Sequence, residues 1–195
     1  MNITTEQIQN LRKETGAGMM DAKKVLVEAE GDFDTAVELL RKRGQKVAAK
    51  KAEREAKEGL IGTYLHSNGK VGVVVEVNCE TDFVARNEQF KELVHDLSLH
   101  IAAASPLYVS EQDVPEDVIA KEKEIYTAQL AQEKVPKKMH TKVIEGKLKK
   151  FYSEVCLLNQ PFLKDQDKTI NDVVTEAISK IGEKIVVKRF SRLAI

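Results

Sequence analysis

Two runs rich in β-branched residues, on either side of an Asn-Gly pair, constrain the fold most strongly. The runs cover 60–65 and 71–77, and the segment between them contains Asn68 and Gly69. Asn-Gly is the strongest short hairpin signal in a sequence. A third apolar run at 184–190 can join this hairpin as a strand. The sequence therefore predicts an α+β fold with a small antiparallel three-stranded sheet covered by helices.

The helices expected around this sheet follow from apolar residues at helical spacing. We predict a long helix from about 82 to 104 and further helices at about 115–133 and 136–157. Another helix is expected to start at 167–169 and to be closed by Gly182. The expected buried face of the long helix comprises Phe90, Leu93, Val94, Leu97, Ile101 and Ala104.

The first 45 residues predict a separate unit of three short helices. Glycines at 16 and 18 interrupt the first helix, Gly31 ends the second, and Gly44 is expected to close the third. Three helices in about 40 residues are typical of small adaptor modules that resemble the ubiquitin-associated (UBA) domain. We therefore expect a UBA-like three-helix module at 1–45.

A basic, alanine-rich stretch separates this module from the rest of the chain. It has strong helix formers without a sustained apolar stripe, so we expect a basic helical linker at 46–57 and an α+β core and dimerisation domain at 58–195. The basic stretch begins inside the module: residues 41–57 hold the eight basic residues Arg41, Lys42, Arg43, Lys46, Lys50, Lys51, Arg54 and Lys57. An RNA contact is the alternative for these residues. The net charge of +0 and the lack of interleaved aromatic residues argue against direct nucleic-acid binding.

Several classes of protein are disfavoured by motifs that the sequence lacks. No run approaches the ~20 apolar residues of a membrane helix, and no secretory signal is visible. No phosphate-binding loop occurs, and the four histidines and two cysteines lack metal-ligand or catalytic spacing. Two buried thiols in a reducing cytosol are the simplest interpretation of Cys79 and Cys156. We expect a binding or regulatory protein with no catalytic residues, cofactor or metal.

Two segments resemble a known family. One is TGAGMMDAKK at 15–24, and the other is NCETDFVARN at 78–87. Together they resemble elongation factor Ts of bacteria and organelles, the guanine nucleotide exchange factor of the translational GTPase elongation factor Tu. The match runs through nearly the whole chain, which has room for only one of the two core units of the family's long forms. The resemblance to the short form implies a homodimer, in the bacterial cytoplasm or in an organellar matrix or stroma.

The resemblance also implies which residues contact the GTPase. In the core they are Thr81, Asp82, Phe83 and Val84, and in the N-terminal module they are Leu11, Arg12, Met19, Met20 and Lys23. His100 matches a further family position, although a buried core histidine fits the sequence equally well. By position alone Phe83 could continue the buried stripe of the long helix, whereas in the family the matching ring enters the GTPase near its nucleotide.

The resemblance implies that the chain promotes GDP release by disturbing the Mg²⁺ and phosphate site of the GTPase. It then stabilises the nucleotide-free GTPase until GTP binds. This step breaks no covalent bond, so it needs no catalytic acid or base. Three other functions stay open from the sequence: a ubiquitin-binding adaptor, an RNA-binding protein that uses 41–57, and an enzyme whose site no residue set identifies.

Overall fold

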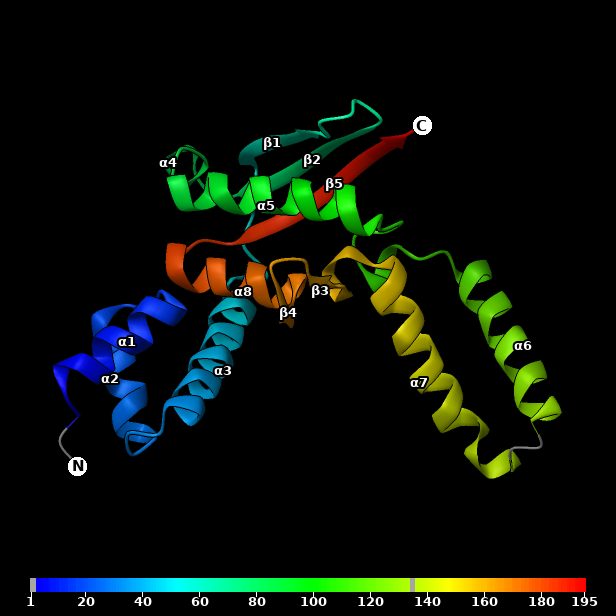
Figure 1. The fold of residues 1–195 in the computed structure, drawn as a ribbon, viewed down its shortest axis with the longest axis horizontal. Coiled ribbons are helices and arrows are strands. Elements are labelled where there is room, and N and C mark those ends of the chain that lie inside the picture. The colour runs from blue at the N-terminus through cyan, green and yellow to red at the C-terminus, as the bar shows by residue number, and fades with distance from the viewer. Residues whose placement is uncertain (1–2, 134–135) are drawn as a thin grey trace. The chain divides into compact units, whose positions relative to one another are not determined.

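The computed structural model describes residues 3–133 and 136–195 and contains helices around two small sheets. The elements in chain order are α1 (Thr5–Thr15), α2 (Met19–Glu28), α3 (Phe33–Lys51), β1 (Glu58–Leu65), β2 (Val71–Cys79), α4 (Asp82–Ala85), α5 (Glu88–Ala104), the 3-10 turn η1 (Glu111–Asp113), α6 (Glu116–Gln132), α7 (Lys137–Val155), the 3-10 turn η2 (Leu157–Asn159), β3 (Pro161–Phe162), β4 (Asp165–Thr169), α8 (Ile170–Ile181) and β5 (Ile185–Ala194) (Figure 1). The described residues form two compact units. The first comprises 3–61, 77–94 and 172–186, and the second comprises 62–76, the described part of 95–171, and 187–195.

The larger sheet has the strand order β1-β2-β5 and is antiparallel, which confirms the predicted α+β fold. The turn between β1 and β2 lies where the sequence predicts it, and of the Asn68-Gly69 pair only the glycine has a positive φ. Gly69 has a φ of +69°, and the side-chain oxygen of Asn68 accepts a hydrogen bond from the backbone N–H of Lys70 at 2.9 Å. In the second unit, the guanidinium of Arg192 on β5 donates to the carbonyl of Ala102 on α5 at 3.1 Å. This hydrogen bond joins the last strand to the helix that covers one face of the sheet.

The three N-terminal helices enclose a hydrophobic cluster of their own. Thr4 and Gln7 form a reciprocal capping box at the start of α1, and Gly16 ends this helix with a φ of +67°. Asp32 caps α3 by accepting a hydrogen bond from Thr35 N–H at 2.7 Å. The buried members of the cluster are Ile8, Leu11, Ala22, Val25, Leu26, Ala29 and Ala36.

The prediction that Gly44 closes the third helix is wrong, because α3 continues to Lys51. Gly44 is buried inside the helix, and a Cβ built on it would lie 3.7 Å from side-chain atoms of both Thr175 and Ser179 of α8. The glycine therefore allows close approach of another helix and does not act as a C-cap. The domain boundaries at 45/46 and 57/58 stay a prediction.

The predicted helix from 82 to 104 is divided into α4 and α5 at Arg86 and Asn87. The side-chain oxygen of Asn87 accepts a hydrogen bond from Gln89 N–H at 2.8 Å, and such a local bond favours a new helix start over continuation. Phe90, Leu97 and Ile101 are buried as predicted. Ala104 is exposed, so the predicted buried face is wrong at its last position.

The small sheet of β3 and β4 was not predicted. Its strands pair antiparallel, with Pro161 opposite Thr169 and Phe162 opposite Asp165. The segment expected to start a helix at 167–169 belongs to β4, so α8 begins at Ile170. The sequence of β4 is Asp-Gln-Asp-Lys-Thr, which carries almost no apolar signal for a strand.

None of the helices in 3–133 or 136–195 combines the length and the apolar content needed to cross a membrane.

Candidate functional site

Phe83 projects from a short turn between β2 and α5 in the first unit. The turn begins with Thr81, whose extended backbone and side-chain oxygen cap the four-residue helix α4; Oγ1 accepts from Val84 N–H at 3.4 Å. Val84 packs inward and is 9% exposed, whereas Phe83 is 79% exposed. The phenyl ring therefore does not continue the buried face of α5. It presents a large apolar surface to solvent on a helix that is only one turn long.

Asp82 precedes Phe83 and carries the charge of the turn. Its carboxylate lies 2.9 Å from the guanidinium of Arg86, one helical turn later, and its side chain is 46% exposed. An exposed ion pair of this kind contributes little to stability. Asp82 therefore remains accessible to a partner beside the phenyl ring.

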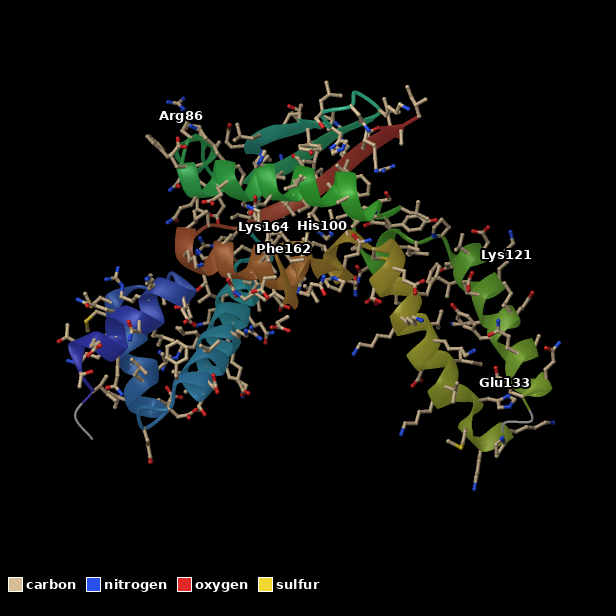
Figure 2. All side chains as sticks on the ribbon, in the orientation of Figure 1. Arg86, His100, Lys121, Glu133, Phe162 and Lys164 are labelled. Carbon is tan, nitrogen blue, oxygen red and sulfur yellow. The ribbon has the colours of Figure 1, made fainter. Side chains whose placement is uncertain are left out.

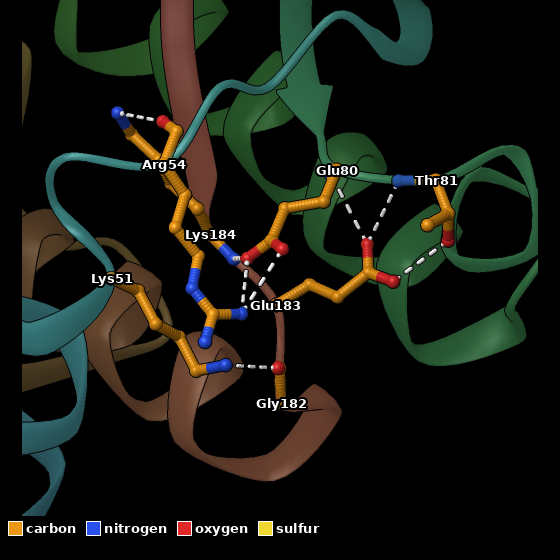
Figure 3. A network of polar contacts seen from close by, with 7 residues as sticks. All are labelled: Lys51, Arg54, Glu80, Thr81, Gly182, Glu183 and Lys184. Carbon is orange, nitrogen blue, oxygen red and sulfur yellow. Dashed lines mark hydrogen bonds and ion pairs between the residues drawn. The ribbon is translucent and has the colours of Figure 1, made fainter.

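Glu183 holds the backbone from which this turn begins (Figure 3). It lies between α8 and β5, and one carboxylate oxygen accepts from the backbone N–H groups of Glu80 and Thr81 at 3.1 and 3.0 Å. The other oxygen accepts from the hydroxyl of Thr81 at 2.7 Å. Three donors of two successive residues thus converge on one half-buried carboxylate.

The residues on either side of Glu183 extend the network to the last residue of α3 and the segment after it (Figure 3). The carboxylate of Glu80 accepts from Lys184 N–H at 2.6 Å and from the guanidinium of Arg54 at 3.2 Å. The hydrogen bond from Lys184, with a smaller contribution from Arg54, holds the pKa of Glu80 below its usual range. Lys51 Nζ donates to the carbonyl of Gly182, and Lys184 Nζ donates to the carbonyls of Ala52 and Arg54.

Cys79 supports the same turn from inside. Its thiol donates to the carbonyl of Thr81 at 3.2 Å, and the side chain is fully buried. Burial, reinforced by the nearby charge of Glu183, raises the pKa of Cys79 to about 11. The thiol is therefore neutral at physiological pH and acts as a hydrogen-bond donor. Every polar atom of Thr81 has a partner, so this residue is committed to holding the turn.

The N-terminal candidates divide into exposed and buried residues. Met19 and Met20 begin α2 and are 47% and 65% exposed, and Lys23 is exposed one turn later. Arg12 is exposed and donates to the carbonyl of Ala17 at 3.2 Å, which holds the loop before Met19. Leu11 is fully buried in the cluster of the three helices, so it supports this surface from below.

His100 lies in the second unit and is 1% exposed, beside Phe162 (Figure 2). Its Nε2 lies 3.0 Å from the side-chain oxygen of Gln160, and its Nδ1 accepts from Leu163 N–H at 3.3 Å. Burial lowers the pKa of His100, and the hydrogen bond to Gln160 opposes this only in part. The ring is a satisfied core histidine, which is the plainer of the two interpretations that the sequence left open.

The first unit therefore carries nine of the ten candidate residues, and the second carries His100. Within the described part of the chain, no three His, Cys, Asp or Glu side chains gather as metal ligands. What the first unit offers is an exposed ring and an accessible carboxylate on α4 and two exposed methionines at the start of α2. Such a surface is suited to binding a protein.

The sequence analysis did not predict that Glu183, Lys184 and Arg54 anchor the turn that carries Phe83. Glu183 is separated by 102 residues from Thr81, and its own segment shows only a glycine between a helix and a strand. A single sequence holds no signal for that pairing.

Comparisons with known proteins agree with the resemblance. The family model described as elongation factor TS matches residues 2–177. The chain is 55% identical to elongation factor Ts of Fervidobacterium nodosum over 195 residues, which covers all of this chain and 99% of that protein. It is 54% identical to the protein of that name from Moorella thermoacetica, covering 99% of this chain and 95% of the relative. On the extent and identity of these matches, the chain belongs to the elongation factor Ts family.

Proposed function

We propose that this chain is a guanine nucleotide exchange factor that binds elongation factor Tu with GDP and accelerates GDP release. It acts without covalent chemistry, in the cytoplasm of a bacterium. The partner follows from the family, and the exposed phenyl ring of Phe83 is the observation on this chain that supports the mechanism most directly.

The physical step is displacement of the groups that hold GDP. A GTPase binds the phosphates through backbone N–H groups of a loop and through Mg²⁺, which bridges protein and phosphate oxygens. A ring inserted between helices beside that loop moves the donors and the metal ligands away from the phosphates. Binding of the factor and binding of GDP then weaken each other by the same ratio, and GTP later releases the factor.

The magnitudes require more than one contact. A 10⁴-fold acceleration needs about 5.5 kcal/mol of differential binding. Burying one phenylalanine side chain supplies roughly 1.5–3 kcal/mol. Phe83 alone is therefore insufficient, and Asp82 and the N-terminal module contribute the remainder.

The second contact is the start of α2. Met19 and Met20 are adjacent and both exposed, and unbranched thioether side chains adapt to irregular apolar surfaces. Arg12, which donates to the carbonyl of Ala17 just before α2, and Lys23 in the first turns of α2 add positive charge nearby. We assign this surface to the body of the GTPase, where it supplies affinity while Phe83 acts near the nucleotide.

A homodimer is the proposed working form. In the second unit, one face of the sheet exposes Leu65, Val74 and Leu193, which are 71%, 48% and 74% exposed. These side chains line a shallow depression of about 270 Å³ that also includes Thr63 and Ser191. An apolar patch on an exposed sheet face is suited to an apolar partner surface, and a second copy of this chain provides one by pairing the patch with itself across a two-fold axis.

Stopped-flow release of a fluorescent GDP analogue from elongation factor Tu tests the proposed exchange activity. We expect strong acceleration by the native chain and at least a tenfold smaller effect with Phe83→Ala, from the area that the ring buries. Leu107→Ala is the matched control, since Leu107 is 68% exposed in the second unit. No acceleration by the native chain at micromolar concentration refutes the proposal. Acceleration that survives Phe83→Ala keeps the activity but moves its main contact to α2.

Light scattering tests the dimer separately. We expect twice the mass of one 21.9 kDa chain for the native protein, and the mass of one chain for Val74→Arg combined with Leu193→Arg. A native protein that has the mass of one chain over a wide concentration range refutes the dimer. Exchange measured with the double variant shows whether activity requires it.

A further inference from the structure

The anchoring of the Phe83 turn points to a role for Glu183. The ring itself is 79% exposed, so contacts with its own chain do little to fix its direction. The helix that carries it has four residues, and one turn of helix is not stable by itself because nucleation is unfavourable. The direction of the ring therefore depends on what holds the backbone before it.

Glu183 is the side chain that holds this backbone. Its carboxylate accepts from Glu80 N–H, Thr81 N–H and the Thr81 hydroxyl, at 3.1, 3.0 and 2.7 Å. The Thr81 hydroxyl in turn caps α4 at Val84. Holding both the backbone N–H and the side chain of Thr81 sets where the next two residues lie, and Phe83 is the second of them.

The chain segment that carries this carboxylate is itself held by contacts of the residues before and after Glu183. Lys51 Nζ donates to the carbonyl of Gly182, immediately before Glu183. Immediately after it, Lys184 donates its N–H to Glu80 at 2.6 Å and its ammonium group to the carbonyl of Ala52 at 2.6 Å. A hydrogen-bond acceptor positioned this firmly can hold a loop in one arrangement before a partner arrives.

We propose that Glu183 is a positioning residue for nucleotide exchange, because it holds the Glu80–Thr81 backbone so that Phe83 points into the partner GTPase. This inference rests on the proposed exchange function. Glu183 acts through Phe83 and does not itself contact the GTPase or its nucleotide. Removing the carboxylate lets the ring sample directions that do not fit the partner.

A spectroscopic test needs no GTPase. The chain contains no tryptophan, so Phe83→Trp introduces a single indole reporter at the proposed position. Time-resolved anisotropy of that indole should show faster and wider local motion when Glu183→Ala is added. Glu183→Gln retains one acceptor oxygen and should restore part of the order. Glu55→Ala is the control, because it removes a carboxylate whose side chain is 76% exposed and forms a surface ion pair with Lys57. Unchanged anisotropy in Glu183→Ala overturns the proposal.

A double-mutant cycle in the exchange assay tests the route of the effect. Glu183→Ala should slow GDP release roughly 10- to 100-fold, since small misplacement of a positioned group has effects of this size. In the Phe83→Ala background it should cause no further slowing, because the group that it positions is already gone. Full, multiplicative slowing in that background overturns the proposal. Should Glu183→Ala fail to fold, Glu183→Gln carries the same cycle with a smaller expected effect.

The two tests separate the two claims. A native chain that does not accelerate GDP release refutes the exchange function, and the anisotropy of the indole then still decides whether Glu183 orders position 83. Acceleration that falls with Phe83→Ala but is untouched by both Glu183 variants supports the exchange function and refutes the positioning role.

Discussion

The Nε2 atom of His100 lies 3.0 Å from the side-chain oxygen of Gln160, 60 residues later in the chain. The amide nitrogen of Gln160 donates to the carbonyl of Glu154 at 2.8 Å, which directs its oxygen toward the imidazole. On the other side of the ring, Nδ1 accepts from Leu163 N–H. A backbone N–H can only donate, so Nδ1 carries no hydrogen, and Nε2 donates its own to Gln160. The site accommodates neutral histidine in one tautomer.

Acid is therefore expected to destabilise the protein through His100. Its pKa in the native state is lowered by burial, whereas the unfolded chain binds a proton near pH 6.5. The stabilising contribution of the neutral ring is present above about pH 6.5 and is lost as the pH falls toward the native pKa. Urea unfolding at pH 7.5 and 5.5 measures the loss. His100→Gln should be less stable at pH 7.5 but should lose less on acidification, whereas the exposed His66→Gln should behave as the native chain does. Equal losses in all three proteins contradict the prediction.

Substitution by alanine should have very different effects on stability at Phe83 and at Phe90. Phe90 is fully buried, and Phe→Ala in a core costs about 3–5 kcal/mol. Phe83 is 79% exposed, so Phe83→Ala should change the free energy of unfolding by less than ~0.5 kcal/mol. Chemical denaturation of both variants checks the pair. A loss of several kcal/mol for Phe83→Ala would mean that the ring packs against its own chain.

These two phenylalanines also show how far a single sequence reaches. Apolar spacing correctly predicts that Phe90 is buried, but the same spacing includes Phe83 seven residues earlier. The helix break at Arg86 and Asn87 separates the two rings. It is favoured by the hydrogen bond from Gln89 N–H to the Asn87 side chain, which the spacing of apolar residues cannot reveal. Resemblance to the family supplied the preference for an exposed Phe83.

Three other features show what local sequence chemistry can and cannot predict. The Asn68-Gly69 turn was predictable because glycine readily adopts the positive φ found at position 69. Gly44 was assigned to a helix end because glycine favours such ends, but contact with α8 keeps it inside α3. Glu183 could not be identified, since its partners Glu80 and Thr81 become neighbours only after the chain folds.

Both thiols should be inert in the native protein. Cys79 and Cys156 are fully buried, and burial raises the pKa of each to about 11. The thiolate is the reactive form, so a thiol reagent such as Ellman's should label neither residue rapidly at pH 8, and both after addition of denaturant. Rapid labelling of either cysteine under native conditions contradicts this prediction.

The same shifts predict a loss of stability in alkali. The neutral thiols stabilise the fold fully below about pH 9, the ordinary value, and this contribution disappears as the pH rises toward about 11. Urea midpoints at pH 8.5 and 10.5 measure the change. Replacing both cysteines by alanine should reduce the loss, while the contribution of the half-buried Tyr126, whose pKa is raised to about 12 by desolvation, remains in both proteins.

Two glycines predict alanine substitutions of opposite sign. Gly146 lies inside α7, and a Cβ built on it meets nothing within 4 Å, so Gly146→Ala should stabilise the protein by about 0.5–1 kcal/mol through helix propensity and a less flexible unfolded chain. Gly59 has a φ of +150°, and a Cβ there would lie 2.2 Å from the carbonyl oxygen of Val77 on β2. Backbone atoms of a paired strand cannot move aside, so Gly59→Ala should destabilise by more than about 1 kcal/mol. Thermal unfolding compares the two variants, and equal midpoints would contradict both the open surroundings of Gly146 and the close contact at Gly59.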